Sequence, residues 1–344
     1  MSRPGVLDRI SPVVESGLKS FMADRTLPLY TMMAYQLGWV DGNGTATAPA
    51  DRDRIRGSLC TLSALACGGG DEAAAAHATA VELIHNYSLI HTDIQEGNPD
   101  RSGRPALWSV WGPAQGINAG DGMHALARLS LFGLRQTGAA PEDVALALRH
   151  LDSATLELCA GAYLDTVFQE QLMVERDEYM TMSRSIGGAL VGGAMQLGAL
   201  AAGVREGPAV EALGRFGVGL GTAFRLAEDY AAFWGAQGRD ETTQGRLLAK
   251  KKTFPVVHAL AEGSGATKRE IGRAYMQRVL GPDHITRITE LLEETGSREF
   301  TQRLIDDTLS DAKAELDEAG LPQEERADIE AVADYAVAQA SGVA

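Results

Sequence analysis

The sequence predicts an all-α protein, and three observations carry the prediction. Through most of the 344 residues, apolar side chains recur every three to four positions, which places them on one face of a helix. No convincing run alternates apolar and polar residues as a half-buried strand would. No internal repeat or low-complexity linker divides the chain, so we expect a single domain over residues 1–344.

Eight long segments show the helical period, and clusters of turn-forming residues separate them. These segments are residues 11–24, 27–38, 52–67, 71–96, 114–137, 141–174, 177–203 and 208–236. Residues 97–113 are rich in glycine and proline and are expected as a loop. The polar residues 237–249 separate the eighth helix from Lys250, and residues 267–341 are expected as charged C-terminal helices.

Composition and charge narrow the class of protein. Hydrophobic residues make up 45% and charged residues 22% of the chain, as is ordinary for a soluble globular protein. The formal net charge of -15 argues against a nucleic-acid-binding protein, since no basic stripe offsets it. The chain shows no signal segment and no apolar run long enough to span a membrane, so we expect a cytoplasmic protein. Cys60, Cys67 and Cys159 are expected as buried free thiols.

The first candidate for chemistry lies at the end of the helix expected over residues 71–96. His85, Leu89 and Asp93 follow one another at intervals of four and therefore share a face, and Glu96 stays on that side. Magnesium binds one or two carboxylates together with the oxygens of a phosphate-bearing substrate. Asp93 and Glu96 are therefore a candidate magnesium site, and the alternative is an ordinary solvated helix end.

A second acidic pair, Glu228 and Asp229, lies near the end of the helix expected over residues 208–236. Two helices that present carboxylates toward each other can clamp magnesium on a shared diphosphate. The metal then stabilises the leaving group while an allylic carbocation forms in a dry apolar cavity. The alternative is a plain salt bridge, because Arg225 stands three and four residues before the two acids.

Four segments resemble the trans-type isoprenyl diphosphate synthases, or polyprenyl synthetases, a family that includes the farnesyl and geranylgeranyl diphosphate synthases. They are residues 80–91, 103–112, 117–122 and 251–260. The resemblance runs from about residue 35 to residue 262. It implies a type I isoprenoid synthase fold, in which a bundle of long helices surrounds a deep central cavity, and it implies a homodimer.

The resemblance also implies roles for individual residues. The ligands of Mg²⁺, around an allylic prenyl diphosphate, would be Asp93, Glu96, Glu228 and Asp229. The side chains that contact diphosphates would be Arg54, Arg56, His85, Arg101, Lys251 and Lys252. Tyr87 and Ser88 lie where the family limits product length, and a tyrosine there implies a pocket for about fifteen to twenty carbons.

The chain departs from the family at positions that bind metal or diphosphate. Thr92 stands where the first motif of the family has its first aspartate, and Ala232 stands where the second motif can have its last. Asp53 replaces a lysine, so a charge that attracts a diphosphate becomes one that repels it. The Lys-Thr pair that the family has in the middle of the cavity is Ile186-Gly187, which removes another cation.

These departures lead to three expectations about function. An enzyme that rearranges a single prenyl diphosphate, of farnesyl or geranylgeranyl size, needs only the ionising site. A terpene synthase-type reaction, by cyclisation or by diphosphate elimination, is therefore the first expectation. The first alternative is a prenyltransferase that adds isopentenyl diphosphate head to tail. The second alternative is a weak or inactive subunit that regulates an active prenyl synthase in a heteromer.

Overall fold

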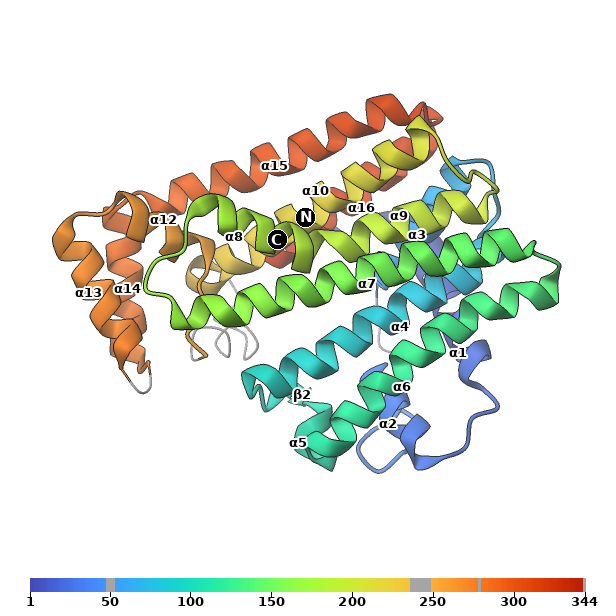
Figure 1. Ribbon diagram of the computed structural model, residues 1–344, viewed down its shortest axis with the longest axis horizontal. Coiled ribbons are helices and arrows are strands. Elements are labelled where there is room, and N and C mark those ends of the chain that lie inside the picture. The colour runs from blue at the N-terminus through green and yellow to red at the C-terminus, as the bar shows by residue number, and fades with distance from the viewer. Residues whose placement is uncertain (48–52, 236–248, 278–279, 343–344) are drawn as a thin grey trace.

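The computed structural model describes residues 1–47, 53–235, 249–277 and 280–342 (Figure 1). Within these ranges the chain is almost entirely helical, which confirms the predicted all-α class. The α-helices are α1 (Gly5–Met22), α2 (Pro28–Gln36), α3 (Ile55–Ala66), α4 (Asp71–Glu96), α5 (Leu107–Trp111), α6 (Pro113–Phe132), α7 (Pro141–Glu170), α8 (Arg176–Ser183), α9 (Ala189–Ala201), α10 (Pro208–Trp234), α12 (Phe254–Glu262), α13 (Gly265–Met276), α14 (Pro282–Glu294), α15 (Ser297–Ala319) and α16 (Gln323–Ser341).

The long helices pack around α9 and α10. In Figure 1, α9 and α10 lie between α7 on one side and α15 on the other. Phe216, Leu220 and Leu226 of α10 are buried in the main core, and α4 packs against α3, α6 and α9. A smaller buried cluster joins the end of α10 to α12, α13 and α14. None of the helices in the described ranges has the length and apolarity that a membrane crossing needs.

The predicted loop over residues 97–113 contains a hairpin and a short helix. Strand β1 (Asp100–Arg101) pairs antiparallel with β2 (Arg104–Pro105), and α5 follows them. Ser102 and Gly103 both have positive φ, the conformation of a tight two-residue hairpin turn. Strands of two residues are too short to alternate visibly, and a helix of five residues is too short to show a period, so the sequence pattern missed both.

The predicted helix over residues 177–203 is interrupted by a π-helical turn, η2 (Arg184–Gly188), between α8 and α9. At this turn the backbones of two elements come unusually close. A Cβ atom on Gly187 would lie 2.5 Å from the carbonyl oxygen of Gly221 in α10, so only glycine fits there. Turns of this kind are frequent at functional sites, and the apolar period alone does not show them.

Other boundaries and burial differ in detail from the prediction. Helix α1 begins at Gly5 rather than at residue 11, because Leu7 and Ile10 extend its buried face. A short 3₁₀ helix, η1 (Gly133–Thr137), ends the segment predicted as one helix to residue 137. Of the three thiols predicted to be buried, Cys60 is buried, Cys67 is half-buried and Cys159 is exposed on α7. The polar segment 237–249 lies outside the described residues except for its last residue.

Candidate active site

A cavity of about 590 Å³ lies between α4, α7, α10 and the residues around η2. Apolar side chains that line it include Leu89, Leu158, Ile186, Leu190 and Phe224. Ionisable side chains that line it include Arg56, His85, Glu96, Arg101, Asp165, Arg225, Glu228 and Lys251. The cavity therefore suits a ligand that has both an apolar and an anionic part. A second cleft of about 1180 Å³ runs between α7, α9, α10 and α15, and its described lining holds none of the predicted metal or diphosphate ligands.

Arg101 holds Asp93 at the C-terminal end of α4. The Nε atom of Arg101 donates to both carboxylate oxygens, at 3.0 and 2.8 Å, and Nη2 donates to Oδ1 at 2.6 Å. The hairpin turn at Ser102 directs Arg101 back toward α4. Burial raises the pKa of Asp93, although the hydrogen bonds from Arg101 oppose this shift. Asp93, predicted as a metal ligand, is thus buried beneath a guanidinium.

Glu96 faces the cavity three residues further along α4. Its Oε2 accepts a hydrogen bond of 2.8 Å from the side-chain amide of Asn98, and its Oε1 lies 3.7 Å from Nζ of Lys251. The same Nζ lies 2.7 Å from Oδ2 of Asp165 on α7. Lys251 therefore links the acidic end of α4 to α7 across one side of the cavity.

The second acidic pair divides between the cavity and the core. Glu228 lines the cavity, whereas Asp229 is fully buried. Oδ2 of Asp229 accepts hydrogen bonds from the Tyr179 hydroxyl and, at 2.9 Å, from the backbone N–H of Phe254. Consecutive residues of a helix point about 100° apart, and here that rotation turns Asp229 into the core and Glu228 to the cavity. Asp229 fixes the segment before α12 to α10, while Glu228 lines the cavity.

Two of the predicted diphosphate-binding side chains form a pair in the cavity wall. Nη1 of Arg56 lies 3.2 Å from Nε2 of His85. Burial, together with the positive charges of Arg56 and Arg101, holds the pKa of His85 well below its ordinary value. The imidazole is therefore neutral, and its Nε2 accepts from the guanidinium.

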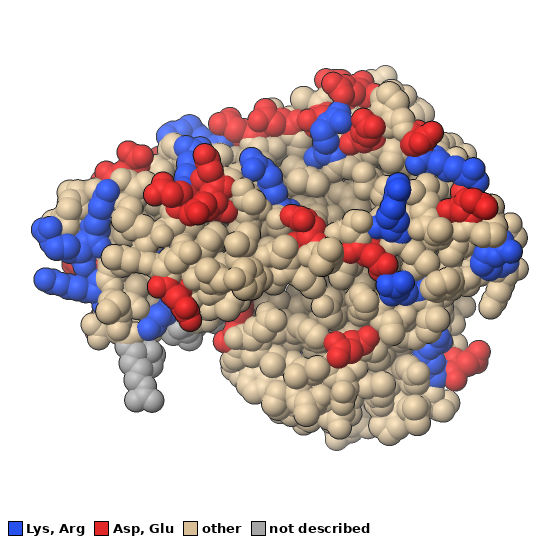
Figure 2. Space-filling model, viewed as in Figure 1, with Lys and Arg blue, Asp and Glu red and all other residues tan. Residues whose placement is uncertain are grey.

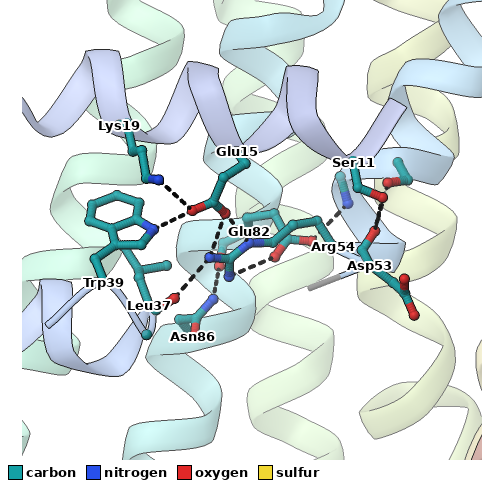
Figure 3. Close-up of polar contacts among 12 residues, drawn as sticks. Ser11, Glu15, Lys19, Leu37, Trp39, Asp53, Arg54, Glu82 and Asn86 are labelled. Atoms are coloured by element: carbon teal, nitrogen blue, oxygen red, sulfur yellow. Dashed lines mark hydrogen bonds and ion pairs between the residues drawn. The ribbon is translucent and has the colours of Figure 1, made fainter. Parts of the chain in front are cut away.

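The structure places Arg54 and Lys252 away from this pair. Arg54 is buried in a polar network between α1 and α4 (Figure 3), where its Nε donates to Glu15 at 2.8 Å and its Nη2 to the carbonyl of Leu37 at 2.9 Å. The Nζ atom of Lys252 lies 4.3 Å from the ring centroid of Tyr275 on α13. Burial, followed by the charge of Lys250, lowers the pKa of Lys252 to about 8.

The negative charge of Asp53 is balanced by contacts of its carboxylate with residues near both ends of the chain. Nε of Arg3 donates to its Oδ1 at 2.5 Å, and the hydroxyl of Tyr335 on α16 donates to its Oδ2 at 2.8 Å. The Asp53 carbonyl accepts from Ser11 and Ser58, at 3.0 and 2.9 Å. The carboxylate that was predicted to repel a diphosphate therefore lies against a cation and a hydroxyl.

Tyr87 and Ser88, the predicted chain-length residues, both line the cavity. They stand nine and eight residues before Glu96, which is about 12–14 Å along the helix axis. The Tyr87 hydroxyl lies 3.6 Å from Sγ of Cys159, and its ring contacts those of His91 and His124. Ser88 donates to the carbonyl of His85 in its own helix at 2.7 Å. Tyr87 therefore presents its ring to the cavity at a distance from the acidic end.

Arg225 is a cavity residue that the sequence predicted only as the partner in a helix salt bridge. Its Nη2 donates to Asp165 on α7 at 3.1 Å, and its Nε lies 3.9 Å from Oδ1 of Asp229. The feature of the sequence that marks this contact is Gly187, on the turn that faces Arg225. A Cβ atom there would lie 2.9 Å from that of Arg225.

The carboxylates of the cavity are suited to a divalent cation that binds together with a diphosphate. Among the described residues, no three His, Cys, Asp or Glu side chains are grouped closely enough to hold a metal by themselves. Glu96 and Glu228 nevertheless present hard oxygen ligands to one cavity. Magnesium is commonly bound by one or two carboxylates with substrate phosphates and waters, so this pair fits the ion.

The arrangement defines a class of protein. Long helices surround one cavity whose wall joins apolar side chains to acids and fixed cations, and this is the all-α fold of the type I isoprenoid synthases. The polyprenyl synthetase family model matches residues 46–292. The chain therefore belongs to the polyprenyl synthetase family.

Similar proteins cover nearly the whole chain. Geranylgeranyl diphosphate synthase of Mycobacterium tuberculosis is 35% identical over 310 residues, which are 90% of this chain and 86% of that protein. The (2E,6E)-farnesyl diphosphate synthase of the same species is 31% identical over 328 residues, 92% of this chain and 88% of that protein.

Solved structures show the same fold. A polyprenyl synthetase from Streptomyces coelicolor A3(2), 30% identical, superposes with a TM-score of 0.86 over 96% of this chain and 98% of that one. A polyprenyl synthase from Caulobacter crescentus, 26% identical, has a TM-score of 0.81 over 98% of this chain and 99% of that one. The Caulobacter protein was crystallised with calcium and isoprenyl diphosphate.

Proposed function

We propose that the chain is a magnesium-dependent prenyltransferase that adds isopentenyl diphosphate to an allylic prenyl diphosphate and forms a product of about fifteen to twenty carbons. The observation that carries the proposal is that cationic side chains from different parts of the fold line one cavity. Arg56 lies beside His85, and Arg101 and Lys251 lie at the acidic end of α4. Two such groups suit two diphosphates. The names of the similar proteins, which are prenyl diphosphate synthases, also favour this alternative over the terpene synthase-type reaction that the sequence placed first.

In this proposal the residues at the acidic end of the cavity bind the allylic diphosphate and the metal ion. Arg101 and Lys251 orient the allylic diphosphate, and Glu96 and Glu228 would hold Mg²⁺ against it. When bound, the ion supplies positive charge that stabilises the departing diphosphate. As the allylic C–O bond breaks, its electron pair stays on the diphosphate, and the apolar wall keeps water from the carbocation.

The second diphosphate lies at Arg56 and His85. Those residues would hold isopentenyl diphosphate so that its double bond faces the allylic carbon. The double bond attacks, a carbon–carbon bond forms, and the departed inorganic diphosphate takes a proton from the adjacent carbon, which gives the longer allylic diphosphate. Because His85 is neutral, the positive charge of this subsite comes from Arg56.

One incubation separates the three expectations. The protein is supplied with Mg²⁺ and geranyl or farnesyl diphosphate, with or without isopentenyl diphosphate, and the extracted products are identified by mass spectrometry. We expect a longer prenyl diphosphate only when isopentenyl diphosphate is present, and no product in the presence of EDTA. A hydrocarbon or alcohol formed without isopentenyl diphosphate would point to a terpene synthase. No product in either mixture, together with co-purification of an active synthase, would point to the regulatory subunit.

We also propose that the protein is a homodimer that pairs through α6 and α7. Leu156 and Tyr163 of α7, seven residues apart and thus on one side of the helix, are 72% and 68% exposed. Leu129 of α6 is 53% exposed, and the surface over α6 carries few charged side chains in Figure 2. A surface of this kind favours a protein partner, and a second copy presents the same apolar face.

The mass in solution tests the dimer. Light scattering during size exclusion should give twice the 36.5 kDa of one chain. The Leu156→Glu/Tyr163→Glu variant should give a single-chain mass. The matched control is Met276→Glu on α13, a residue 82% exposed far from this face, which should stay dimeric. A wild-type protein of single-chain mass would contradict the proposal.

A further inference from the structure

Helix α13 presents basic and apolar side chains to solvent on one side. Arg269, Arg273 and Met276 follow one another at intervals of four and three residues, so they share a face of the helix. All three are exposed, and Met276 is exposed to 82%. Ile271, on the other side of the helix, is fully buried in the smaller core cluster. The helix is thus held to the protein by its inner side and leaves the outer one uncovered.

Two apolar side chains of the loop between α7 and α8 extend this surface. Leu172 and Met173 are 61% and 48% exposed. A Cβ atom on Gly272 would lie 3.3 Å from Cδ1 of Leu172, so the Leu172 side chain lies against α13. Together Arg269, Arg273, Met276, Leu172 and Met173 form what we call the α13 face. Apolar side chains that gather on a surface beside charges mark an interaction site.

The charge of the α13 face is opposite to that of the chain as a whole. The formal net charge is -15, yet neither Arg269 nor Arg273 forms an ion pair with an acid within the described ranges. The one acid of α13, Glu270, is held by Arg287 of α14 at 2.7 and 3.1 Å. Basic side chains gather in Figure 2 at the left end, where Figure 1 shows α13. The face therefore suits an anionic partner.

The end of α13 is also bonded to the segment that enters the cavity wall. The Tyr275 hydroxyl donates to the carbonyl of Lys251 at 3.4 Å, and Nζ of Lys250 donates to the carbonyl of Gln277. The side chain of Lys251 lines the cavity, which suits a ligand with an apolar and an anionic part. A ligand of that kind also enters a lipid surface. This position, together with the basic and apolar side chains, favours a lipid bilayer over a protein as the partner.

We propose that the α13 face docks the protein on an anionic lipid bilayer. Arg269 and Arg273 bind the phosphates of the headgroups, while Met276, Leu172 and Met173 enter the boundary between headgroups and acyl chains. The contact is peripheral, and it does not depend on the proposed function because it needs no substrate.

Cosedimentation of the full chain with vesicles tests the docking. One set of vesicles is phosphatidylcholine alone, and in the other about one third of the lipid is phosphatidylglycerol. We expect binding to the anionic vesicles and none to the neutral ones. Arg269→Gln/Arg273→Gln should weaken this binding about thirtyfold, since each arginine near an anionic surface contributes about fivefold. Leu172→Ser/Met276→Ser should weaken it about threefold or more.

Two further variants separate the α13 face from net charge. Arg135→Gln/Arg149→Gln makes the same change of charge at exposed positions in η1 and α7, and it should bind within about twofold of the wild type. Glu170→Gln removes an exposed acid two residues before Leu172 and should bind more tightly. An equal loss in the two double arginine variants would overturn the proposal. A wild type that binds neither kind of vesicle would also overturn it and would favour a protein as the partner of this face.

Discussion

Arg101 donates three hydrogen bonds of 2.6–3.0 Å to the two carboxylate oxygens of Asp93, and the Asp93 residue is only 1% exposed. Removing one partner of such a pair leaves the other charge buried and unpaired. We expect Arg101→Met to lower the free energy of unfolding by about 3 kcal/mol. Urea unfolding measures it, and the double variant Arg101→Met/Asp93→Asn should recover part of the loss because it removes the stranded charge. A loss below about 1 kcal/mol for Arg101→Met would contradict a stabilising pair.

Neutral substitution of the neighbours Glu228 and Asp229 should affect different properties, the Mg²⁺ dependence of activity for Glu228 and the folding stability for Asp229. Glu228→Gln removes a carboxylate that lines the cavity, so the Mg²⁺ concentration for half-maximal activity should rise by about tenfold or more with little change in the melting temperature. Asp229→Asn weakens the hydrogen bonds from Tyr179 and Phe254, so unfolding free energy should fall by about 1–3 kcal/mol. Titrations of activity with Mg²⁺, paired with thermal unfolding, measure both. The same result for the two variants would contradict this division.

The different surroundings of Glu228, in the cavity wall, and Asp229, in the core, mark the limit of what the sequence predicted at the site. The helical period placed the long helices, because apolar periodicity reports directly on burial. The family resemblance, rather than the period, implied that the ends of α4 and α10 meet at one cavity. It did not show which acid of a pair faces the cavity. That depends on rotation about the helix and on partners far along the chain, such as Arg101 for Asp93.

The basic residues show the same limit. Arg54 and Arg56 are two residues apart, yet Arg54 lies in a network with Glu15 and Arg56 lies in the cavity wall. The contact of Arg225 with the facing turn follows from a π-helical insertion between α8 and α9, which no periodic pattern reports. The hairpin that presents Arg101 is likewise too short for a pattern to reveal.

Restoring the family's lysine at position 53 should not improve the enzyme. Asp53→Lys would place a cation beside Arg3 and remove the acceptor of the Tyr335 hydroxyl. We expect unfolding free energy to fall by about 1–2 kcal/mol and the KM for isopentenyl diphosphate not to decrease. Asp24→Lys, at an exposed position after α1, is the control with the same charge change. A lower KM at unchanged stability would show that position 53 acts on the substrate.

The Tyr87 ring should limit product length. Tyr87→Ala removes the ring from the cavity wall, so the main product should lengthen by at least one five-carbon unit. Tyr87→Phe keeps the ring and should keep the product. Ser88→Ala should also keep it, because the Ser88 hydroxyl bonds to its own helix. Chromatography of the dephosphorylated products reads the length, and an unchanged product from Tyr87→Ala would place the limit elsewhere.

His77 should make folding stability sensitive to pH between about 4 and 6.5. It is buried in α4 at 4% exposure, and burial lowers its pKa from 6.5 to about 4 even though its ring lies 3.3 Å from the Ala73 carbonyl. The unfolded chain therefore binds a proton in this range that the folded chain does not, so stability is complete above 6.5 and falls as the pH drops toward 4. The loss attributable to His77 is about 3 kcal/mol. His77→Gln removes the titrating group, so the difference in unfolding free energy between wild type and variant should change by this amount from pH 7 to pH 4. Between pH 7 and pH 8 the two curves should run parallel, and parallel curves down to pH 4 would show that His77 is protonated in the folded protein.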